Sequence, residues 1–113
     1  MVKLVPNVKI WLETKDRRSV IGKGGIELIK AINEQGSIHK AAKSLNMSYS
    51  HAADLINELN DILGVEILEK VRGGIGGGGT KITKEGMNLV KQYEEINSQI
   101  LDVIKKYGGI KIG

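Results

Sequence analysis

Hydrophobic residues follow two different periods along the chain, and each period predicts its own kind of element. Alternating apolar residues over 8–14 predict a short strand, and residues 19–21 predict a second strand after a polar turn. Apolar residues at helical spacing predict a helix over residues 25–35, and Gly36 directly after them predicts its end. The chain therefore begins with a small β element that leads into helical structure.

Two further helices are predicted over residues 37–45 and 48–63, with a tight turn at Asn46 and Met47 between them. A short helix, a tight turn and a longer helix make up the helix-turn-helix motif. The small residues that the helix crossing needs are Ala41, Ala42, Ala52 and Ala53. An ordinary helical hairpin would show much of the same pattern, so the spacing favours DNA binding without excluding this alternative.

A β-hairpin is predicted directly after these helices, with strands at 65–71 and 80–83 joined by the glycine-rich residues 73–79. A hairpin in this position is typical of a winged helix-turn-helix, and its glycine amides could approach DNA phosphates closely. A surface loop without function would fit the same residues. A nucleotide-binding phosphate loop would not, because the required lysine and serine or threonine are missing and a strand follows the glycines.

The longest helix is predicted over residues 84–107, after Thr83 as its N-cap. Its apolar residues step by four and three positions, which is typical of a coiled-coil seam. We therefore expect a homodimer that forms through Leu89, Tyr93, Ile96, Ile100, Val103 and Tyr107. The first part of this stripe could instead pack on residues 26–32 of the same chain.

The fold class that we expect is mainly α with a small β component, a winged helix-turn-helix with a long C-terminal helix. The winged helix-turn-helix should span residues 1–83, with the two DNA-binding helices at about 37–63 and the wing at about 65–83. The helix over 84–107 should belong to the same structural unit. Residues 108–113 form a tail without a clear signal.

Composition supports one domain, since 113 residues suffice for a single hydrophobic core. Only 4% of the residues are aromatic, so this core should be aliphatic. The absence of cysteine excludes disulfides, a cysteine nucleophile and thiolate metal sites. No apolar run reaches the roughly 20 residues of a membrane span, and no signal peptide precedes the first strand, so we expect a cytoplasmic location. No pattern indicates an enzyme, a metal site or a cofactor.

The net charge of +4 is unevenly distributed along the chain. Residues 37–53 contain two lysines and both histidines but no acidic residue, and residues 70–84 contain four basic residues and no acidic one. The segment between them, 54–69, contains five acidic residues and no basic one. Such blocks predict one positive and one negative face, and a positive face suits double-stranded DNA as the partner.

Candidate DNA contacts follow from this arrangement. The second helix of the motif starts with polar, non-acidic side chains, which can reach base edges past the phosphates. We expect base or phosphate contacts from Ser48, Tyr49, Ser50, His51 and Asp54. We expect phosphate contacts from Lys40, Lys43, Arg72, Lys81 and the wing glycines Gly74, Gly76 and Gly77. His39 or His51 could instead be an ordinary surface residue. A protein–protein interaction module and a nonspecific, chromatin-type DNA-binding protein on the same fold remain the alternatives.

The sequence resembles the N-terminal DNA-binding domain of the ModE-type molybdenum-responsive regulators, which are relatives of the LysR-type winged helix-turn-helix proteins. The resemblance runs from residue 9 to residue 93. It is carried by Lys9-Ile10-Trp11-Leu12-Glu13, Gly36-Ser37-Ile38, Ala41-Ala42, Met47-Ser48-Tyr49, Asn57-Glu58-Leu59-Asn60, the run 73–79, Ile82-Thr83, and the stretch from Gly86 to Tyr93. It implies a DNA-binding transcriptional regulator.

The chain departs from this family's pattern in three respects. Ala53 stands where the family commonly has tryptophan, which bears on helix packing or base choice. Arg72 stands where the family commonly has threonine, which adds a cation at the wing. Nothing in the sequence matches the oxyanion-binding β domains that molybdate-sensing members carry after the long helix, so we expect no molybdate binding by this chain alone.

Overall fold

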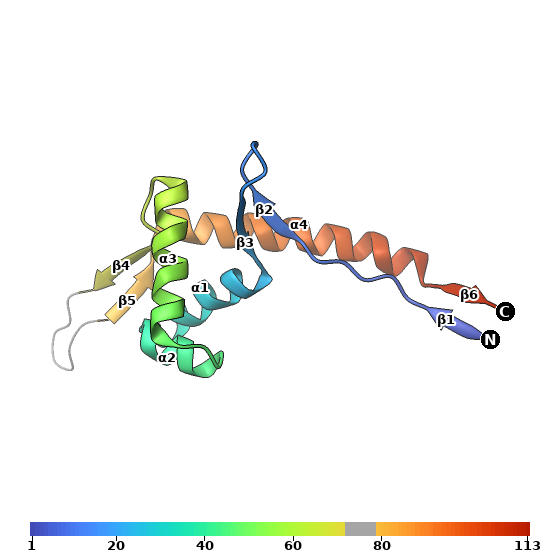
Figure 1. Cartoon of the computed structure of the whole chain (residues 1–113), viewed down its shortest axis with the longest axis horizontal. Coiled ribbons are helices and arrows are strands. Elements are labelled where there is room, and N and C mark those ends of the chain that lie inside the picture. Colours follow the sequence, from blue (N-terminus) through green and yellow to red (C-terminus); the bar gives the residue numbers. More distant parts are fainter. Residues whose placement is uncertain (72–78) are drawn as a thin grey trace.

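The computed structural model describes residues 1–71 and 79–113 and shows an elongated molecule of 64 × 32 × 23 Å (Figure 1). The helices are α1 (Lys23–Gln35), α2 (Ile38–Ser44), α3 (Tyr49–Leu63) and α4 (Lys84–Tyr107). The strands are β1 (Val2–Leu4), β2 (Trp11–Glu13), β3 (Ser19–Gly22), β4 (Leu68–Val71), β5 (Gly79–Ile82) and β6 (Ile110–Ile112). They pair as three antiparallel two-stranded sheets, β1–β6, β2–β3 and β4–β5. The expected fold class, mainly α with a small β component, is confirmed.

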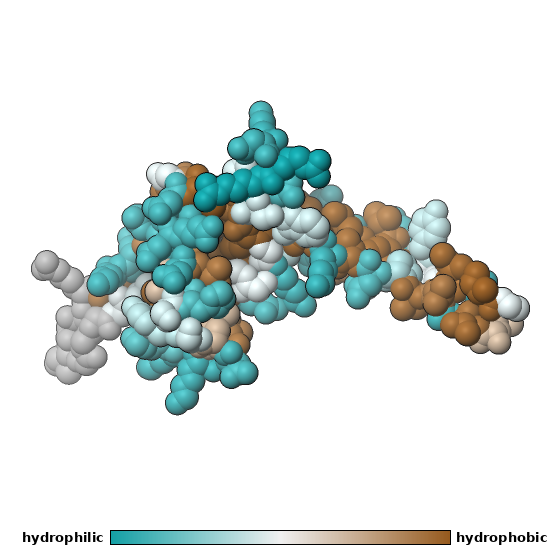
Figure 2. Space-filling model, viewed as in Figure 1, coloured by the Kyte–Doolittle hydropathy of each residue, from teal (hydrophilic) through white to brown (hydrophobic). Residues whose placement is uncertain are grey.

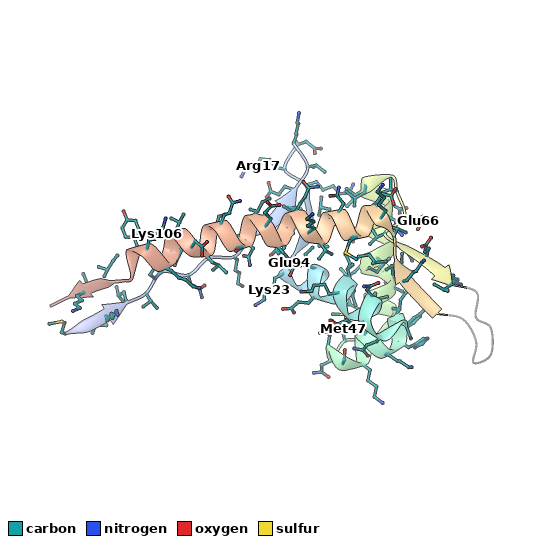
Figure 3. The ribbon with its side chains drawn as sticks, turned by 180° about the vertical axis from the view of Figure 1, so that it is seen from behind. Arg17, Lys23, Met47, Glu66, Glu94 and Lys106 are labelled. Atoms are coloured by element: carbon teal, nitrogen blue, oxygen red, sulfur yellow. The ribbon has the colours of Figure 1, made fainter. Side chains whose placement is uncertain are left out.

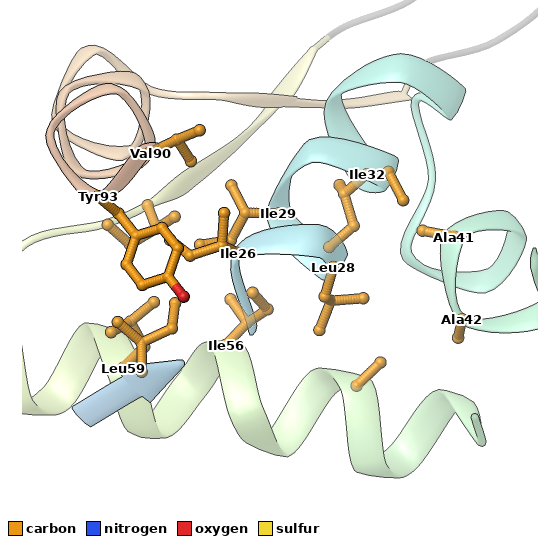
Figure 4. Packing of buried hydrophobic residues seen from close by; sticks show 14 residues of the cluster. Ile26, Leu28, Ile29, Ile32, Ala41, Ala42, Ile56, Leu59, Val90 and Tyr93 are labelled. Atoms are coloured by element: carbon orange, nitrogen blue, oxygen red, sulfur yellow. The ribbon is translucent and has the colours of Figure 1, made fainter. Parts of the chain in front are cut away.

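The hydrophobic core lies where α1, α2, α3 and the first half of α4 meet (Figure 4). Helix α1 is central, and its Leu28, Ile29 and Ile32 side chains are fully buried. Figure 4 shows Ile56 and Leu59 of α3 and Val90 and Tyr93 of α4 turned toward the α1 side chains. As the composition predicted, the core is almost entirely aliphatic, with Tyr93 as its aromatic member.

Helix ends fall where the sequence predicts them. Gly36 and Gly64 adopt the left-handed conformation, with φ of 73° and 69°, and each donates its backbone N–H to a carbonyl four residues earlier. This geometry is favourable for glycine because glycine has no Cβ. The side chains of Ser37, Ser48 and Thr83 cap α2, α3 and α4.

The wing is an antiparallel hairpin of β4 and β5 that starts later than expected, at Leu68 instead of residue 65. Asn60 at the end of α3 explains the difference. Its side-chain oxygen accepts a hydrogen bond from the Ile67 N–H at 2.9 Å, and its amide donates to the Glu66 carboxylate at 2.8 Å. These side-chain hydrogen bonds, and not β-strand pairing, fix the connection between α3 and the wing.

Helix α4 has the predicted length, but its apolar stripe divides into two parts. Val90 and Tyr93 are buried in the core of their own chain, and Leu89 packs against that core. The Tyr93 hydroxyl donates a hydrogen bond to the Ile10 carbonyl at 2.8 Å. Tyr93 is therefore buried in its own chain, so little of its side chain is left for the dimer contact that the sequence predicts for it.

A small ribbon of β1 and β6 joins the two ends of the chain beyond the last turn of α4 (Figure 1). The tail 108–113, for which no element was predicted, supplies one of its strands. Val2, Leu4, Ile110 and Ile112 share one face of the ribbon, because Val2 pairs with Ile112 and Leu4 with Ile110. Lys3 and Lys111 lie opposite each other on the other face. Within the ranges described, no helix is long and apolar enough to cross a membrane.

Candidate nucleic-acid interface

Helix α3 has one face fixed in the core and one face open to solvent. Ala52, Ile56 and Leu59 are buried, whereas Ser50 and Asp54 are exposed. Since residues three and four apart lie on the same side of a helix, the apolar spacing determines which side chains point outward. The predicted contact residues of α3 therefore lie together at the accessible start of the helix.

The first turn of α3 is organised by Ser48. Its hydroxyl oxygen accepts a hydrogen bond from the His51 N–H at 3.1 Å, which satisfies a helix-terminal donor. His51 and Ser50 are exposed beyond this cap. Ser48 thus has a structural role in addition to the predicted DNA contact, and its hydroxyl proton remains able to donate.

Helix α2 lies against α3 and presents its basic residues to solvent. Ala41 and Ala42 are buried, and Lys40 and Lys43 are exposed. The turn between the helices places Asn46 at φ of 57°, a conformation that asparagine tolerates better than most residues. Met47 in this turn packs against the core, and Figure 3 shows it on the helical body of the molecule, far from Lys106 of α4.

The rings of His39 and Tyr49 form a contact that the sequence does not predict. Their centroids are 3.9 Å apart and the ring planes differ by 7°, so the rings are stacked. His39 belongs to α2 and Tyr49 is the first residue of α3, so the stack links the two helices at the accessible end of the motif. They lie ten positions apart in the sequence, and no periodic pattern signals such a pair.

The wing residues fall on two faces of the hairpin. Glu69 pairs with Lys81 in register, and Lys70 pairs with Thr80. The Lys81 ammonium lies 3.4 Å from the Glu69 carboxylate, so the phosphate contact predicted for Lys81 has to compete with an ion pair. The predicted contacts Arg72, Gly74, Gly76 and Gly77 lie outside the residues that the structure describes.

Hydrogen bonds attach the wing to the helices. The Thr80 N–H donates to the Gly36 carbonyl at 2.8 Å, and the Ile82 N–H donates to the Asn33 side chain at 3.2 Å. A Cβ on Gly86 would lie 2.6 Å from the Ile67 carbonyl oxygen, so α4 also approaches the wing closely. The wing therefore has a fixed position relative to α2 and α3.

Two groups outside this surface have shifted pKa values. The pKa of Lys30 is raised, chiefly because its ammonium donates a 2.8 Å hydrogen bond to Glu94, a link between α1 and α4. The pKa of Asp16 is lowered, chiefly because the Thr14 hydroxyl donates a hydrogen bond to its carboxylate. Over the described part of the chain, no three histidine or acidic side chains are grouped as metal ligands.

Comparison with known proteins agrees with this geometry. Residues 25–87 match the family described as bacterial regulatory helix-turn-helix protein, lysR family. The DNA-binding transcriptional dual regulator ModE of Escherichia coli K12 is 38% identical over 82 residues, and the transcriptional regulator ModE of Haemophilus influenzae is 35% identical over 89. These alignments cover 70% and 78% of the chain, and 31% and 35% of the two regulators, so the chain spans about a third of their length.

Solved structures show the same fold. The BenM DBD–benA site 1 DNA complex has a TM-score of 0.55 at 24% identity, covering 75% of the chain and 90% of BenM DBD. The CbnR DBD–DNA complex has a TM-score of 0.52 at 25% identity, covering 75% of the chain and 87% of CbnR DBD. With its fold, its helix-turn-helix and its match over residues 25–87, the chain belongs to the LysR family of bacterial regulatory helix-turn-helix proteins and is similar in sequence to the ModE regulators.

Proposed function

We propose that the chain binds double-stranded DNA with a preference for particular sequences, as the DNA-binding part of a cytoplasmic transcriptional regulator. The observation that carries this proposal is the start of α3. Its side chains from Ser48 to His51 are exposed, polar and free of acidic groups, while the same helix is anchored in the core by Ala52 and Ile56. A helix presented in this way suits insertion into the major groove. The DNA complexes of the BenM and CbnR domains, which share the fold, support it.

The proposed contacts divide into two kinds. Tyr49, Ser50 and His51 read base edges, with Asp54 one turn further along α3. Lys40 and Lys43 of α2 contact phosphates, and the wing adds Arg72 and the amides of its glycines. Phosphate contacts set affinity and position, whereas base contacts set sequence preference.

We further propose that two chains pair through the second half of α4. Ile96, Ile100, Val103 and Tyr107 are between 36% and 80% exposed, so the core of the single chain leaves them uncovered. Figure 2 shows apolar side chains gathered over this half of α4 and over the β1–β6 ribbon. A two-fold dimer would bind two half-sites about one or two helical turns of DNA apart.

Selection from a random duplex library at low salt, followed by binding measurements, tests the proposal. We expect an enriched, two-fold-related sequence and an affinity that falls steeply with salt. Equal affinity for all duplexes would favour the nonspecific, chromatin-type alternative. No detectable binding at low salt would contradict the proposal and favour a protein–protein interaction module on the same fold.

A further inference from the structure

An open cleft of about 420 Å³ lies between the helix-turn-helix and the base of the wing. One wall carries His39 of α2 and Tyr49 of α3, and the other carries Lys70 of β4 and Thr80 of β5. Among the described residues that line the cleft, none is acidic. Its polar groups are therefore cationic or neutral hydrogen-bonding groups, which is the chemistry that suits an anion.

Of the lining residues that the structure describes, Lys70 is the one that carries a fixed positive charge. Because successive residues of a strand point to opposite faces, Lys70 and Thr80 share one face of the wing, and the ion pair of Glu69 with Lys81 lies on the other. Over residues 1–71 and 79–113, Lys70 forms no ion pair within 4.0 Å. Residues 72–78 contain no acidic side chain, so that segment has no carboxylate to neutralise it.

The opposite wall is held in one geometry by the stacked rings. The His39 and Tyr49 centroids lie 3.9 Å apart with nearly parallel planes, which restricts both side chains although both residues are exposed. An imidazole ring carries at least one N–H donor, and the Tyr49 hydroxyl can also donate. The stack therefore presents hydrogen-bond donors opposite the Lys70 ammonium.

The two walls are joined at the base of the cleft. The Thr80 N–H donates to the Gly36 carbonyl at 2.8 Å, directly where α1 ends and α2 begins. A Cβ on Gly79 would lie only 3.0 Å from the same carbonyl oxygen, so the glycine permits this close approach. The distance between wing and helices is thus set before any ligand binds, which lowers the entropy lost on binding.

We propose that this cleft binds one backbone phosphate of duplex DNA, with Lys70 as the cation and with Thr80 and His39 as hydrogen-bond donors. The proposal rests on the proposed DNA binding and adds a specific site to it. When α3 enters the major groove and the wing lies beside it, the sugar–phosphate backbone of one DNA strand passes between α3 and the wing. That backbone then lies over the cleft. Lys70 then takes the role at the wing that the sequence pattern assigned to Lys81.

Salt dependence separates these two lysines. In duplex titrations at several salt concentrations, Lys70→Gln should flatten the slope of log affinity against log salt by about 0.9, the value for one lost phosphate contact. Lys81→Gln is the matched control on the other face of the wing. It removes a charge that Glu69 already balances, so the slope should change much less. Equal effects of the two substitutions, or an unchanged slope in Lys70→Gln, would overturn the proposal.

Replacing single phosphates by uncharged methylphosphonates locates the contact on the DNA. In the selected duplex, we expect one position per half-site where the replacement weakens the unmodified protein but causes no further loss in Lys70→Gln. If the affinity lost through each methylphosphonate and the affinity lost through Lys70→Gln were additive at every position, Lys70 would not contact any of the replaced phosphates, contrary to the proposal.

His39→Phe keeps a flat ring against Tyr49 but lacks the N–H donor. We expect it to weaken binding of all duplexes about fivefold, the effect of one hydrogen bond. An unchanged affinity would remove His39 from the proposed site. If the unmodified chain bound no duplex at all, the proposed function itself would fail. If it bound with an affinity and salt slope that do not depend on Lys70, only the phosphate site would fail.

Discussion

Gly86 shows how a single residue can set the distance between two elements. A Cβ at this position would lie 2.6 Å from the Ile67 carbonyl oxygen and 2.6 Å from the Ile82 side chain. We expect Gly86→Ala to lower the free energy of unfolding by about 1–3 kcal/mol, because backbone at the start of the wing has to move. Denaturant unfolding measures the change.

Gly24→Ala is the matched control for this substitution. Gly24 also lies in the first turn of a helix, but a Cβ there would have no neighbour within 4 Å. Since alanine favours helix formation over glycine, stability should be unchanged or slightly higher. A loss of stability in Gly24→Ala as large as that in Gly86→Ala would argue against close approach as the cause.

Individual side chains on the interface should differ in what they contribute to DNA binding. Tyr49→Ala should reduce discrimination between preferred and other sequences by roughly 1–3 kcal/mol, the value of one specific contact. Lys43→Gln should weaken binding to all sequences alike, because it loses a phosphate contact. Competition titrations with preferred and scrambled duplexes measure both effects. A change of preferred sequence in Lys43→Gln, with preference intact in Tyr49→Ala, would show that the two roles are reversed.

At the level of elements, the sequence was most informative where a periodic pattern and a terminating residue coincide. The helices that end at Gly36 and Gly64 were predicted to within about two residues, and so was α4, which begins after the Thr83 cap. Strands of three or four residues give little periodicity, so the β1–β6 ribbon was missed. The start of the wing was misplaced because it depends on the Asn60 side chain and not on a pattern.

The candidate site was only partly predictable, because sequence patterns describe single elements and not how elements are placed relative to one another. Exposure of residues along α3 follows from the spacing of buried residues in one helix, so this part of the site could be read from the sequence. The contact of His39 with Tyr49 and the separation of Lys70 from Lys81 depend on how α2, α3 and the wing are placed in space. Tyr93 fits a coiled-coil seam and a core equally well by spacing, and its burial depends on how α1, α3 and Ile10 are placed around α4.

The connection from α3 to the wing should depend on one side chain. Asn60→Ala removes the acceptor for the Ile67 N–H, and this part-buried donor would lose its partner. We expect a destabilisation of about 1–3 kcal/mol and weaker DNA binding through a displaced wing. Thermal unfolding and duplex titration provide the two measurements. Asn57→Ala, an exposed position one turn earlier on the same helix, should leave stability nearly unchanged; a similar loss there would argue against the connection as the cause.

For the whole molecule, the dimer proposal predicts that a substitution in the second half of α4 can abolish dimerisation while the chain stays folded. Ile100 is 36% exposed and lies outside the core, so Ile100→Lys should give a folded monomer that has lost most of its affinity for paired half-sites. Sedimentation and circular dichroism measure assembly and folding. Gln99→Lys adds the same charge at an exposed polar position and should leave the dimer intact. A monomeric unmodified protein at tens of micromolar would contradict the proposal.

The 113-residue chain should not bind molybdate at micromolar concentrations. A tetrahedral oxyanion needs converging donors that are shielded from water. In the part of the chain that the structure describes, no charged residue is buried, and the buried Tyr93 hydroxyl already donates to the Ile10 carbonyl. Water and salt therefore compete for every described cation, including Lys70 in the open cleft, which needs the rest of the DNA contact to hold a phosphate. Calorimetric titration provides the measurement, and saturable, stoichiometric binding of molybdate that sulfate does not reproduce would contradict this expectation.

Because packing along α4 is uneven, we expect its backbone amides to exchange their hydrogens at two different rates. The helix is about 36 Å long, and only its first half is anchored, through Val90 and Tyr93. Amides near these residues exchange their hydrogens only when the core opens, whereas amides beyond them open by local fraying at a much smaller free energy. Pairing of two chains would protect the second half in proportion to protein concentration and leave the first half unaffected. The stability of the second half of α4 would then depend on dimerisation, and so on the protein concentration.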